Sequence, residues 1–248
     1  MHSVVLTHAA TVTTMSSINS QIESRIRQVR ERIRDAEIRY GREPGSVSLL
    51  AVSKTHGIEK VKAAMACGQT RFGESYWQDA MAKIEALPEL EWHFIGPLQS
   101  NKCKQVARHF AWIHSLERIK TAALLSAARQ AANDDAGGEP LQVCLQVNIS
   151  GEASKSGVTI DQLDELAYQV AELPGLRLRG LMTIPPFNAD EGACRHQFAT
   201  LRQQLEGLRE QITSLDTLSM GMSHDLEWAI AEGATIVRIG TDIFGARD

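Results

Sequence analysis

Lys54 is the residue of this sequence best suited to covalent chemistry. It follows residues 49–53 (LLAVS), a largely apolar run typical of a buried strand. A lysine at the end of such a strand would be partly desolvated, which lowers the pKa of its ammonium group and frees the amine to attack an aldehyde. The alternative is a strand-end lysine whose amine extends into solvent, and for Lys54 taken alone that interpretation is favoured.

A second unusual side chain lies in the last apolar segment of the chain. Arg238 alternates with Val237 and Ile239, so it points to the opposite face of the predicted strand. A guanidinium group is always charged, and an inward-facing Arg238 would therefore require a specific acceptor. Gly240 and Thr241 follow at once and could offer backbone N–H groups and a hydroxyl to an anion.

The segment before the last one contains a matching half of an anion site. Ser223 follows Met222 at a predicted strand-to-helix junction, where it could be both a helix N-cap and a phosphate donor. Taken alone, Ser223 is better explained as a cap and Gly240 as a turn. Together with Lys54 and Arg238 they predict a site for a phosphorylated aldehyde.

The elements that must position these residues alternate along the chain. Apolar residues at three- and four-residue steps predict a first helix from residue 18 to residue 40. Further helices are expected at residues 58–66, 76–87, 101–110, 118–133, 160–173, 193–213 and 225–232, and strands at residues 47–52, 70–72, 92–95, 112–114, 141–147, 176–182, 215–219 and 236–239.

Eight strands, each beside a helix, predict an α/β fold that is a single (β/α)8 TIM-type barrel with an extra N-terminal helix. The alternative is a doubly wound open sheet, which is less favoured because no G-x-G-x-x-G follows the first strand. In a barrel, functional residues lie at the carboxyl ends of the strands, and phosphate is commonly held after strands seven and eight. Lys54, Ser223, Gly240 and Thr241 occupy such positions.

Composition narrows the class of protein further. The 248 residues are 43% hydrophobic and suit one domain, expected at residues 17–248, after a flexible N-terminal extension at residues 1–16. The net charge of -4 is spread along the chain without a basic block, which argues against nucleic acid as a partner. We see no apolar run long enough for a membrane span and no secretory signal, so we expect a cytoplasmic protein that does not bind membranes.

Cysteine and histidine spacing predicts no metal site. Cys67, Cys103, Cys144 and Cys194 lie far apart and are expected to be reduced thiols. His93 and His114 end or nearly end strands, where lone histidines are more often structural than ligands. Asp225 and Glu227 fall in the first turn of a predicted helix, where acids favour the helix dipole, and we assign no catalytic residue.

Several motifs resemble one known family. They are AVSKT (51–55), FGE (72–74), WHFIGPLQSNK (92–102), SKSG (154–157), RGLM (179–182) and the region 220–245. They are similar to the YggS/PROSC family of pyridoxal phosphate homeostasis proteins, and the similarity covers nearly everything after Ser17. Two positions depart from the family pattern: Ser75 replaces the usual Asn, and His56 replaces a frequent Lys or Arg.

The resemblance implies a barrel of the alanine-racemase type without the second, β-rich domain of that enzyme. It implies that pyridoxal 5′-phosphate (PLP) is bound as a Schiff base on Lys54 and that Arg238 faces the pyridine nitrogen. It further implies that the phosphate is held by Ser223, Gly240 and Thr241, with Met222 lining the same pocket. The Ser75 departure weakens the implication of a side-chain contact from position 75. The His56 departure concerns how the cofactor is passed on.

The function expected from these residues is binding rather than catalysis. An arginine at the pyridine nitrogen disfavours its protonation and weakens PLP as an electron sink. Racemases of this shape take an acid/base residue from an appended domain, for which residues 244–248 leave no room. We therefore expect a monomeric protein that stores, buffers or delivers PLP, with transient contacts to PLP-dependent apo-enzymes. The alternatives are a weak PLP-dependent amino-acid racemase using Lys54 alone, and a Schiff-base aldolase without a cofactor.

Overall fold

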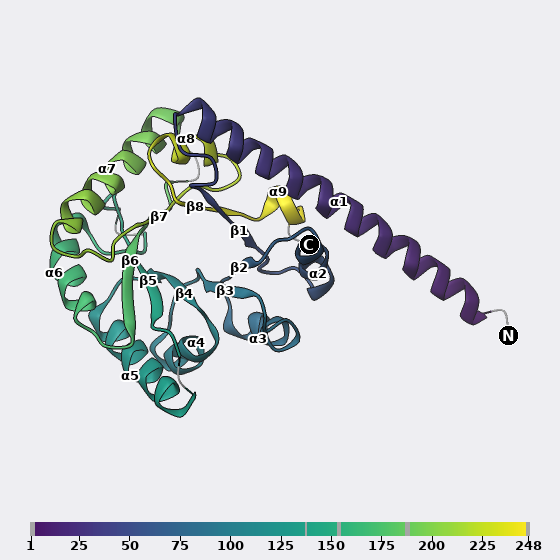
Figure 1. The fold of residues 1–248 in the computed structure, drawn as a ribbon, viewed down its shortest axis with the longest axis horizontal. Helices are drawn as coiled ribbons and strands as arrows, with labels where there is room; N and C mark the ends of the chain where they lie inside the picture. Colours follow the sequence, from purple (N-terminus) through teal and green to yellow (C-terminus); the bar gives the residue numbers. More distant parts are fainter. Residues whose placement is uncertain (1–2, 137, 153–154, 187–188, 247–248) are drawn as a thin grey trace.

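The computed structural model describes residues 3–136, 138–152, 155–186 and 189–246, with only the backbone described for residues 3–18 and 134–136. Within these residues, eight strands close into a barrel in the order β1 to β8 (Figure 1). Neighbouring strands are parallel throughout, and β1 pairs with β8 to complete the ring. The predicted TIM-type (β/α)8 fold with an N-terminal helix is therefore confirmed.

Strands and helices lie close to the positions that the sequence pattern predicts. The strands are β1 (Ser48–Val52), β2 (Arg71–Glu74), β3 (Glu91–Phe94), β4 (Trp112–Leu116), β5 (Leu141–Gln146), β6 (Leu176–Met182), β7 (Thr217–Ser219) and β8 (Ile236–Ile239). The α-helices are α1 (Ser3–Arg39), α2 (Ile58–Ala66), α3 (Trp77–Ala86), α4 (Cys103–His109), α5 (Ile119–Ala136), α6 (Ile160–Ala171), α7 (Glu191–Arg209), α8 (Leu226–Ala231) and α9 (Thr241–Phe244). The last of these, α9, is a helix that the sequence pattern does not predict.

The N-terminal helix is longer than expected. Helix α1 begins at Ser3 rather than near residue 18, and its first part projects beyond the barrel (Figure 1). From Ile22 onward it buries an apolar stripe that includes Ile26 and Val29, and it packs against α2, α8 and α9. Residues 3–16 thus continue the same helix, residues 1–2 lie outside the described part, and the division into a flexible extension and a domain stays a prediction.

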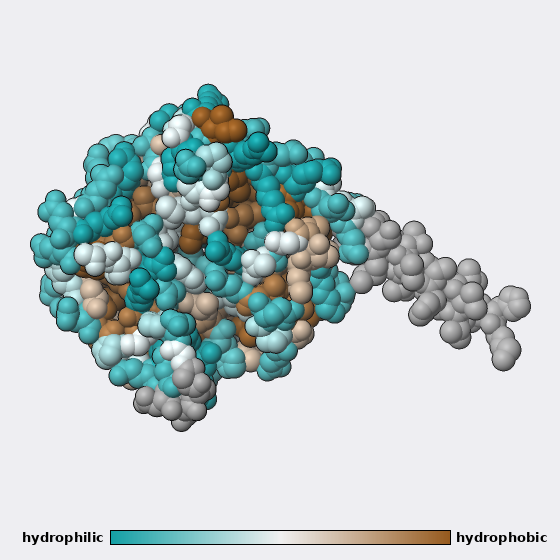
Figure 2. Space-filling model, viewed as in Figure 1, coloured by the Kyte–Doolittle hydropathy of each residue, from teal (hydrophilic) through white to brown (hydrophobic). Residues whose placement is uncertain are grey.

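The barrel separates two kinds of interior. The main apolar core lies between strands and helices and includes Phe72, Ile113 and Leu181. Because side chains alternate across a strand, the intervening positions face the lumen, where Trp112, Cys144 and Met182 form a smaller cluster. The face shown in Figure 2 is mostly hydrophilic, with apolar side chains visible mainly in the hollows between elements. The lumen also holds the buried polar side chains of His93, His114, Ser219 and Arg238.

Membrane spans and cysteine bonding, both considered in the sequence, can be examined in the described residues. None of the helices in this part of the chain combines the length and apolar character needed to cross a membrane. All four cysteines are free in the structure, and three of them are buried.

Gly180 in β6 permits the close approach of β7, and its replacement gives a test of the barrel register. A Cβ atom at this position would overlap the backbone carbonyl of Thr217. We expect Gly180→Ala to lower the free energy of unfolding by about 3 kcal/mol or more, as overpacking of a rigid core does. Urea denaturation followed by circular dichroism measures this.

Gly207 provides the matched control, because it is exposed on α7 and a Cβ atom there meets nothing within 4 Å. Gly207→Ala is expected to raise stability by about 0.5 to 1 kcal/mol through helix propensity alone. Equal effects of the two substitutions would contradict the β6–β7 register.

Candidate ligand-binding site at the barrel mouth

A cavity of about 290 Å³ opens at the carboxyl ends of the barrel strands. The structure brings together around it every residue that the sequence predicts for the site: Lys54, Met222, Ser223, Arg238, Gly240 and Thr241. Four further lining residues, Val52, Ile95, Ile184 and His224, are not predicted. Val52 ends β1 and Ile95 directly follows β3, and that position is a usable signal. The shared cavity is a geometric fact, and the binding roles of the six residues stay predictions.

Lys54 lies in a turn that begins as β1 ends, and its side chain is half-buried. The next residue, Thr55, has a φ of 68°, in the left-handed region that residues other than glycine rarely adopt. Such backbone strain is held in place by the surrounding structure and is common at functional sites. No sequence pattern at Thr55 signals this conformation.

A buried ion pair supports the backbone immediately before Lys54. The Lys83 ammonium group lies 2.7 Å from Oε1 of Glu74 and donates a second bond to the carbonyl oxygen of Ser53 at 2.9 Å. The Ser53 hydroxyl donates to the same Glu74 oxygen at 2.7 Å. Burial raises the pKa of the Glu74 carboxyl group, and the neighbouring Lys83 opposes that shift. This cluster, from α3 and β2, holds the end of β1 in place.

Breaking one half of this pair should be more damaging than replacing both halves. We expect Lys83→Met to lower the free energy of unfolding by about 3 to 5 kcal/mol, because it leaves the Glu74 carboxylate buried and uncompensated. Lys83→Met combined with Glu74→Leu should recover at least half of that loss. Denaturant unfolding measures both, and Lys62→Met at an exposed lysine of α2 is the control. A loss below about 1 kcal/mol for Lys83→Met would contradict this account.

The loop after β7 is shaped by a buried acid. Gly221 has a φ of 95°, and a Cβ atom there would come within 2.6 Å of the Ala229 side chain, so glycine is required. Oδ1 of Asp225 accepts a hydrogen bond from the Met222 N–H group, and burial raises the pKa of its carboxyl group. Asp225, not Ser223, occupies the N-cap position of α8, so the N-cap prediction for Ser223 is wrong. Ser223 lies in the preceding turn, at the cavity.

Arg32 of α1 ties together the two loops that carry the predicted phosphate donors. Its guanidinium group lies 2.8 Å from Glu227 of α8 and 2.6 Å from Asp242 of α9, and it donates to the Ser223 carbonyl oxygen at 3.0 Å. The hydrogen bond with Glu227 is the main cause of the raised pKa of Arg32, which burial partly opposes. No local sequence pattern indicates this role of Arg32, because its partners lie far apart along the chain.

Removing the Arg32 clamp should loosen both loops. We expect Arg32→Met to lower the free energy of unfolding by only about 1 kcal/mol, because the ion pairs are half-exposed and screened by water. Hydrogen exchange at residues 223–225 and 241–244 should accelerate selectively. Arg34→Met, at an exposed arginine of the same helix, is the control. Unchanged exchange in both loops would refute the clamp.

Arg238 points into the barrel lumen and is buried. Its Nη1 donates to the backbone carbonyl and the hydroxyl of Ser219, and its Nη2 donates to the Thr183 carbonyl oxygen at 2.9 Å. Burial lowers the pKa of Arg238 to about 10, so the group is still a cation at neutral pH. The specific acceptors that an inward arginine requires are thus supplied by the protein itself.

The other candidate residues that the structure describes do not line the cavity. His93 and His114 are buried, and their rings are hydrogen-bonded to each other at 2.9 Å. Within the described residues, no cluster of three or more His, Cys, Asp or Glu side chains is placed to hold a metal ion. His56 is buried against the ring of Phe244, and neither His56 nor Ser75 lines the cavity. Ser154 of the SKSG segment lies outside the described residues.

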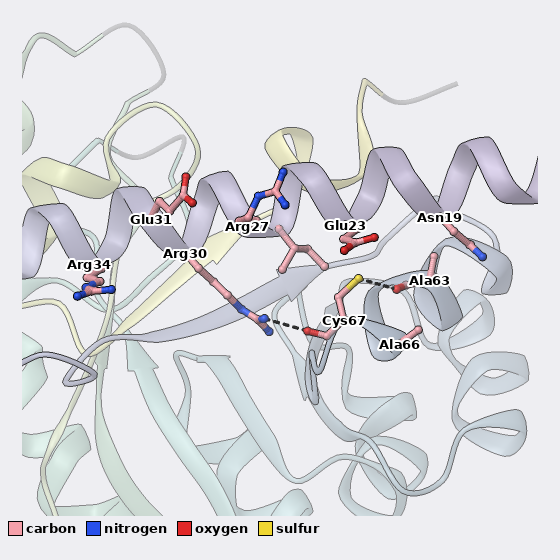
Figure 3. A pocket seen from close by; sticks show the side chains of 10 residues that line it. Asn19, Glu23, Arg27, Arg30, Glu31, Arg34, Ala63, Ala66 and Cys67 are labelled. Carbon is pink, nitrogen blue, oxygen red and sulfur yellow. Dashed lines mark hydrogen bonds between the residues drawn. The ribbon is translucent and has the colours of Figure 1, made fainter.

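A larger groove of about 510 Å³ lies between α1 and α2 (Figure 3). Arg30 points from α1 toward Cys67 and donates to its carbonyl oxygen at 2.9 Å. The Cys67 thiol donates to the Ala63 carbonyl oxygen, and burial raises the pKa of that thiol. The described lining of this groove contains no lysine amine, so the smaller cavity at the barrel mouth is the better candidate for covalent chemistry.

Known proteins share this fold. The profile of the family described as alanine racemase, N-terminal domain, matches residues 19–248, which defines the class of protein. The chain is 53% identical to the pyridoxal phosphate homeostasis protein of Pseudomonas aeruginosa over 231 residues, covering 92% of this chain and 97% of that one. It therefore belongs to the family of pyridoxal phosphate homeostasis proteins, as the resemblance of its motifs predicts.

Two solved structures extend the comparison. PipY of Synechococcus elongatus, solved with PLP bound, is 36% identical with a TM-score of 0.79, over 91% of this chain and 100% of that one. The alanine racemase of Corynebacterium glutamicum is 15% identical with a TM-score of 0.68, over 94% of this chain and 62% of the racemase. At that identity the racemase shows a shared fold alone.

Proposed function

We propose that this protein binds PLP as a Schiff base on Lys54 and serves in intracellular PLP homeostasis by storing, buffering or delivering the cofactor, with little or no catalysis. The observation that carries the proposal is that Lys54 shares one cavity with Arg238 and with the predicted phosphate donors. The names of the curated relatives and the PLP bound to PipY support it.

The residues present fit a phosphorylated aldehyde. The Lys54 amine would condense with the aldehyde carbon, forming a C=N bond with loss of one water. The hydroxyls of Ser223 and Thr241, with backbone N–H groups after Gly240, would hold the phosphate in the position usual for this fold. A cavity of about 290 Å³ suits one small ligand.

The same residues favour binding over turnover. PLP supplies an electron sink when bound, and that sink is strongest where a carboxylate holds a proton on the ring nitrogen. Among the described residues that line the cavity there is no Asp or Glu, whereas Arg238 offers only N–H donors and is held as a cation. A site of this kind keeps the cofactor without strongly activating it.

One observation favours the weak racemase as a second candidate. The imidazole of His224 lines the cavity and lies 3.3 Å from Asp225. Histidine is a common general acid or base, so His224 would be the second proton-transfer group beside Lys54 in such a reaction. We further propose a cytoplasmic monomer that meets PLP-dependent apo-enzymes only transiently.

Absorbance spectroscopy tests the proposal directly. The protein incubated with PLP should show a band at roughly 410 to 430 nm, expected of a protonated PLP Schiff base because the chromophore belongs to the cofactor. Borohydride should abolish the band, and mass spectrometry should locate the reduced adduct on Lys54. Lys54→Ala should lack the band, and Lys62→Ala should keep it. A colourless wild-type protein after reconstitution would overturn PLP binding and favour the aldolase.

Amino-acid turnover separates the carrier from the racemase. The PLP-loaded protein should produce D-alanine from L-alanine at no more than a trace rate over free PLP. Robust turnover that is lost in both Lys54→Ala and His224→Gln would establish the racemase instead.

A further inference from the structure

A continuous chain of hydrogen bonds runs through the barrel lumen from Arg238 to the opposite end of the barrel. Nη1 of Arg238 lies 2.8 Å from Oγ of Ser219, which lies 2.7 Å from Nδ1 of His114. Nε2 of His114 lies 2.9 Å from Nδ1 of His93, and Nε2 of His93 lies 2.8 Å from Oε1 of Glu91. Glu91 begins β3 and lines a separate pocket of about 490 Å³ with residues from the amino ends of the strands.

Only one direction of donation satisfies every bond in this chain. A guanidinium group has no acceptor, so Arg238 must donate to the Ser219 hydroxyl. The Ser219 oxygen has two lone pairs, so the rest of the direction is fixed from the other end of the chain. The Glu91 carboxylate only accepts, so a neutral His93 must donate to it from Nε2 and accept at Nδ1. His114 then carries its proton on Nε2, which it donates to His93, and its Nδ1 accepts the hydrogen of the Ser219 hydroxyl. The chain of hydrogen bonds therefore begins at the Arg238 cation and ends at the Glu91 anion.

Burial and neighbouring charges stabilise this direction of hydrogen-bond donation. Burial lowers the pKa of His114 well below its ordinary value and also lowers that of His93, which favours the neutral form of both rings at neutral pH. The hydrogen bond from His93 is the main cause of the lowered pKa of Glu91, to which Arg71 of β2 adds at 3.2 Å. Each charged end of the chain thus faces a group that stabilises its charge.

Outside this chain of hydrogen bonds, Asp225 in the loop after β7 also acts on Arg238 and partly opposes the lowering of its pKa by burial. Two described lumen groups, Cys144 and Trp112, take no proton from the chain at neutral pH. On β5, burial raises the pKa of the Cys144 thiol to about 12, so the thiol stays protonated. On β4, the Trp112 ring stacks on the His93 ring with centroids 5.4 Å apart. The guanidinium carbon of Arg179 on β6 lies over the Trp112 ring, 5.0 Å from its centroid. The guanidinium group of Arg179 is itself paired with Asp216.

We propose that His93, His114 and Ser219 are positioning residues for Arg238. Because His114 takes the Ser219 hydrogen, the hydroxyl lone pairs remain directed at Arg238, and the guanidinium group is held at one place beside the ligand cavity. The effect of this positioning on PLP rests on the proposed function, whereas the direction of hydrogen-bond donation does not. The lumen chain, defined as Glu91, His93, His114, Ser219 and Arg238, thereby connects the far end of the barrel with the binding site.

The direction of the lumen chain is testable without cofactor. In protein labelled with 15N-histidine, NMR at pH 7.5 should show both rings as neutral Nε2–H tautomers, and on acidification both should stay neutral below the ordinary histidine pKa. His93→Asn and His114→Asn assign the signals. Either ring titrating near its ordinary pKa, or carrying its proton on Nδ1, would overturn the proposal.

The effect on the cofactor site separates positioning from mere packing. His114→Phe keeps an aromatic ring but removes the acceptor, whereas His114→Asn retains an acceptor near the position of Nδ1. We expect His114→Phe to raise the Kd for PLP about tenfold and to shift the pH midpoint of the absorbance band, with less than about a threefold change in Kd for His114→Asn. Equal losses in the two variants, or no change in either, would refute positioning.

A further variant covers the case in which His114→Phe does not fold. Ser219→Ala removes the hydroxyl with little change in volume and should give the same loss of affinity and the same shift of the band. Wild-type protein that binds no PLP would instead refute the proposed function, and the NMR experiment would then still decide the lumen chain.

Discussion

A permanent positive charge inside the barrel is the constraint on which the rest of this structure depends. Removing a guanidinium group from water is costly unless every N–H group that it buries finds an acceptor. Arg238 finds carbonyl and hydroxyl acceptors on β7 and just beyond β6, so three neighbouring strands must end in register. The polar lumen follows from this requirement, because Ser219 needs His114 in turn and His114 needs His93.

At the mouth of the barrel, too, buried or half-buried polar groups hold segments that are far apart in sequence. Polar groups from elsewhere in the chain fix the conformations of the loops there. Lys83 holds the backbone before Lys54, and Asp225 holds the backbone before Ser223. Arg32 reaches from α1 to both α8 and α9, which makes the N-terminal helix part of the site rather than an appendage. A ligand cavity with prearranged walls is the result.

Much of the fold could be read from local patterns. The three- and four-residue spacing of Ile22, Ile26 and Val29 predicts the buried stripe of α1, and the apolar runs before Lys54 and around Arg238 predict β1 and β8. Helix α9 was missed because four residues after a glycine carry no periodicity. Motif resemblance and strand-end position together found the six residues around the cavity, since barrels bring the carboxyl ends of their strands to one mouth.

The sequence by itself determined the order of strands and helices, the apolar faces that close the barrel, and the placement of Lys54, Ser223 and Arg238 at strand ends. These features follow from side-chain periodicity along a single segment, which is a local property of the chain. Only the tertiary structure decided that Arg32 joins two loops, that Asp225 rather than Ser223 occupies the N-cap position of α8, and that His93 and His114 lie in one hydrogen-bonded line. Those features are distances between segments far apart in sequence, and such distances exist only once the barrel has closed.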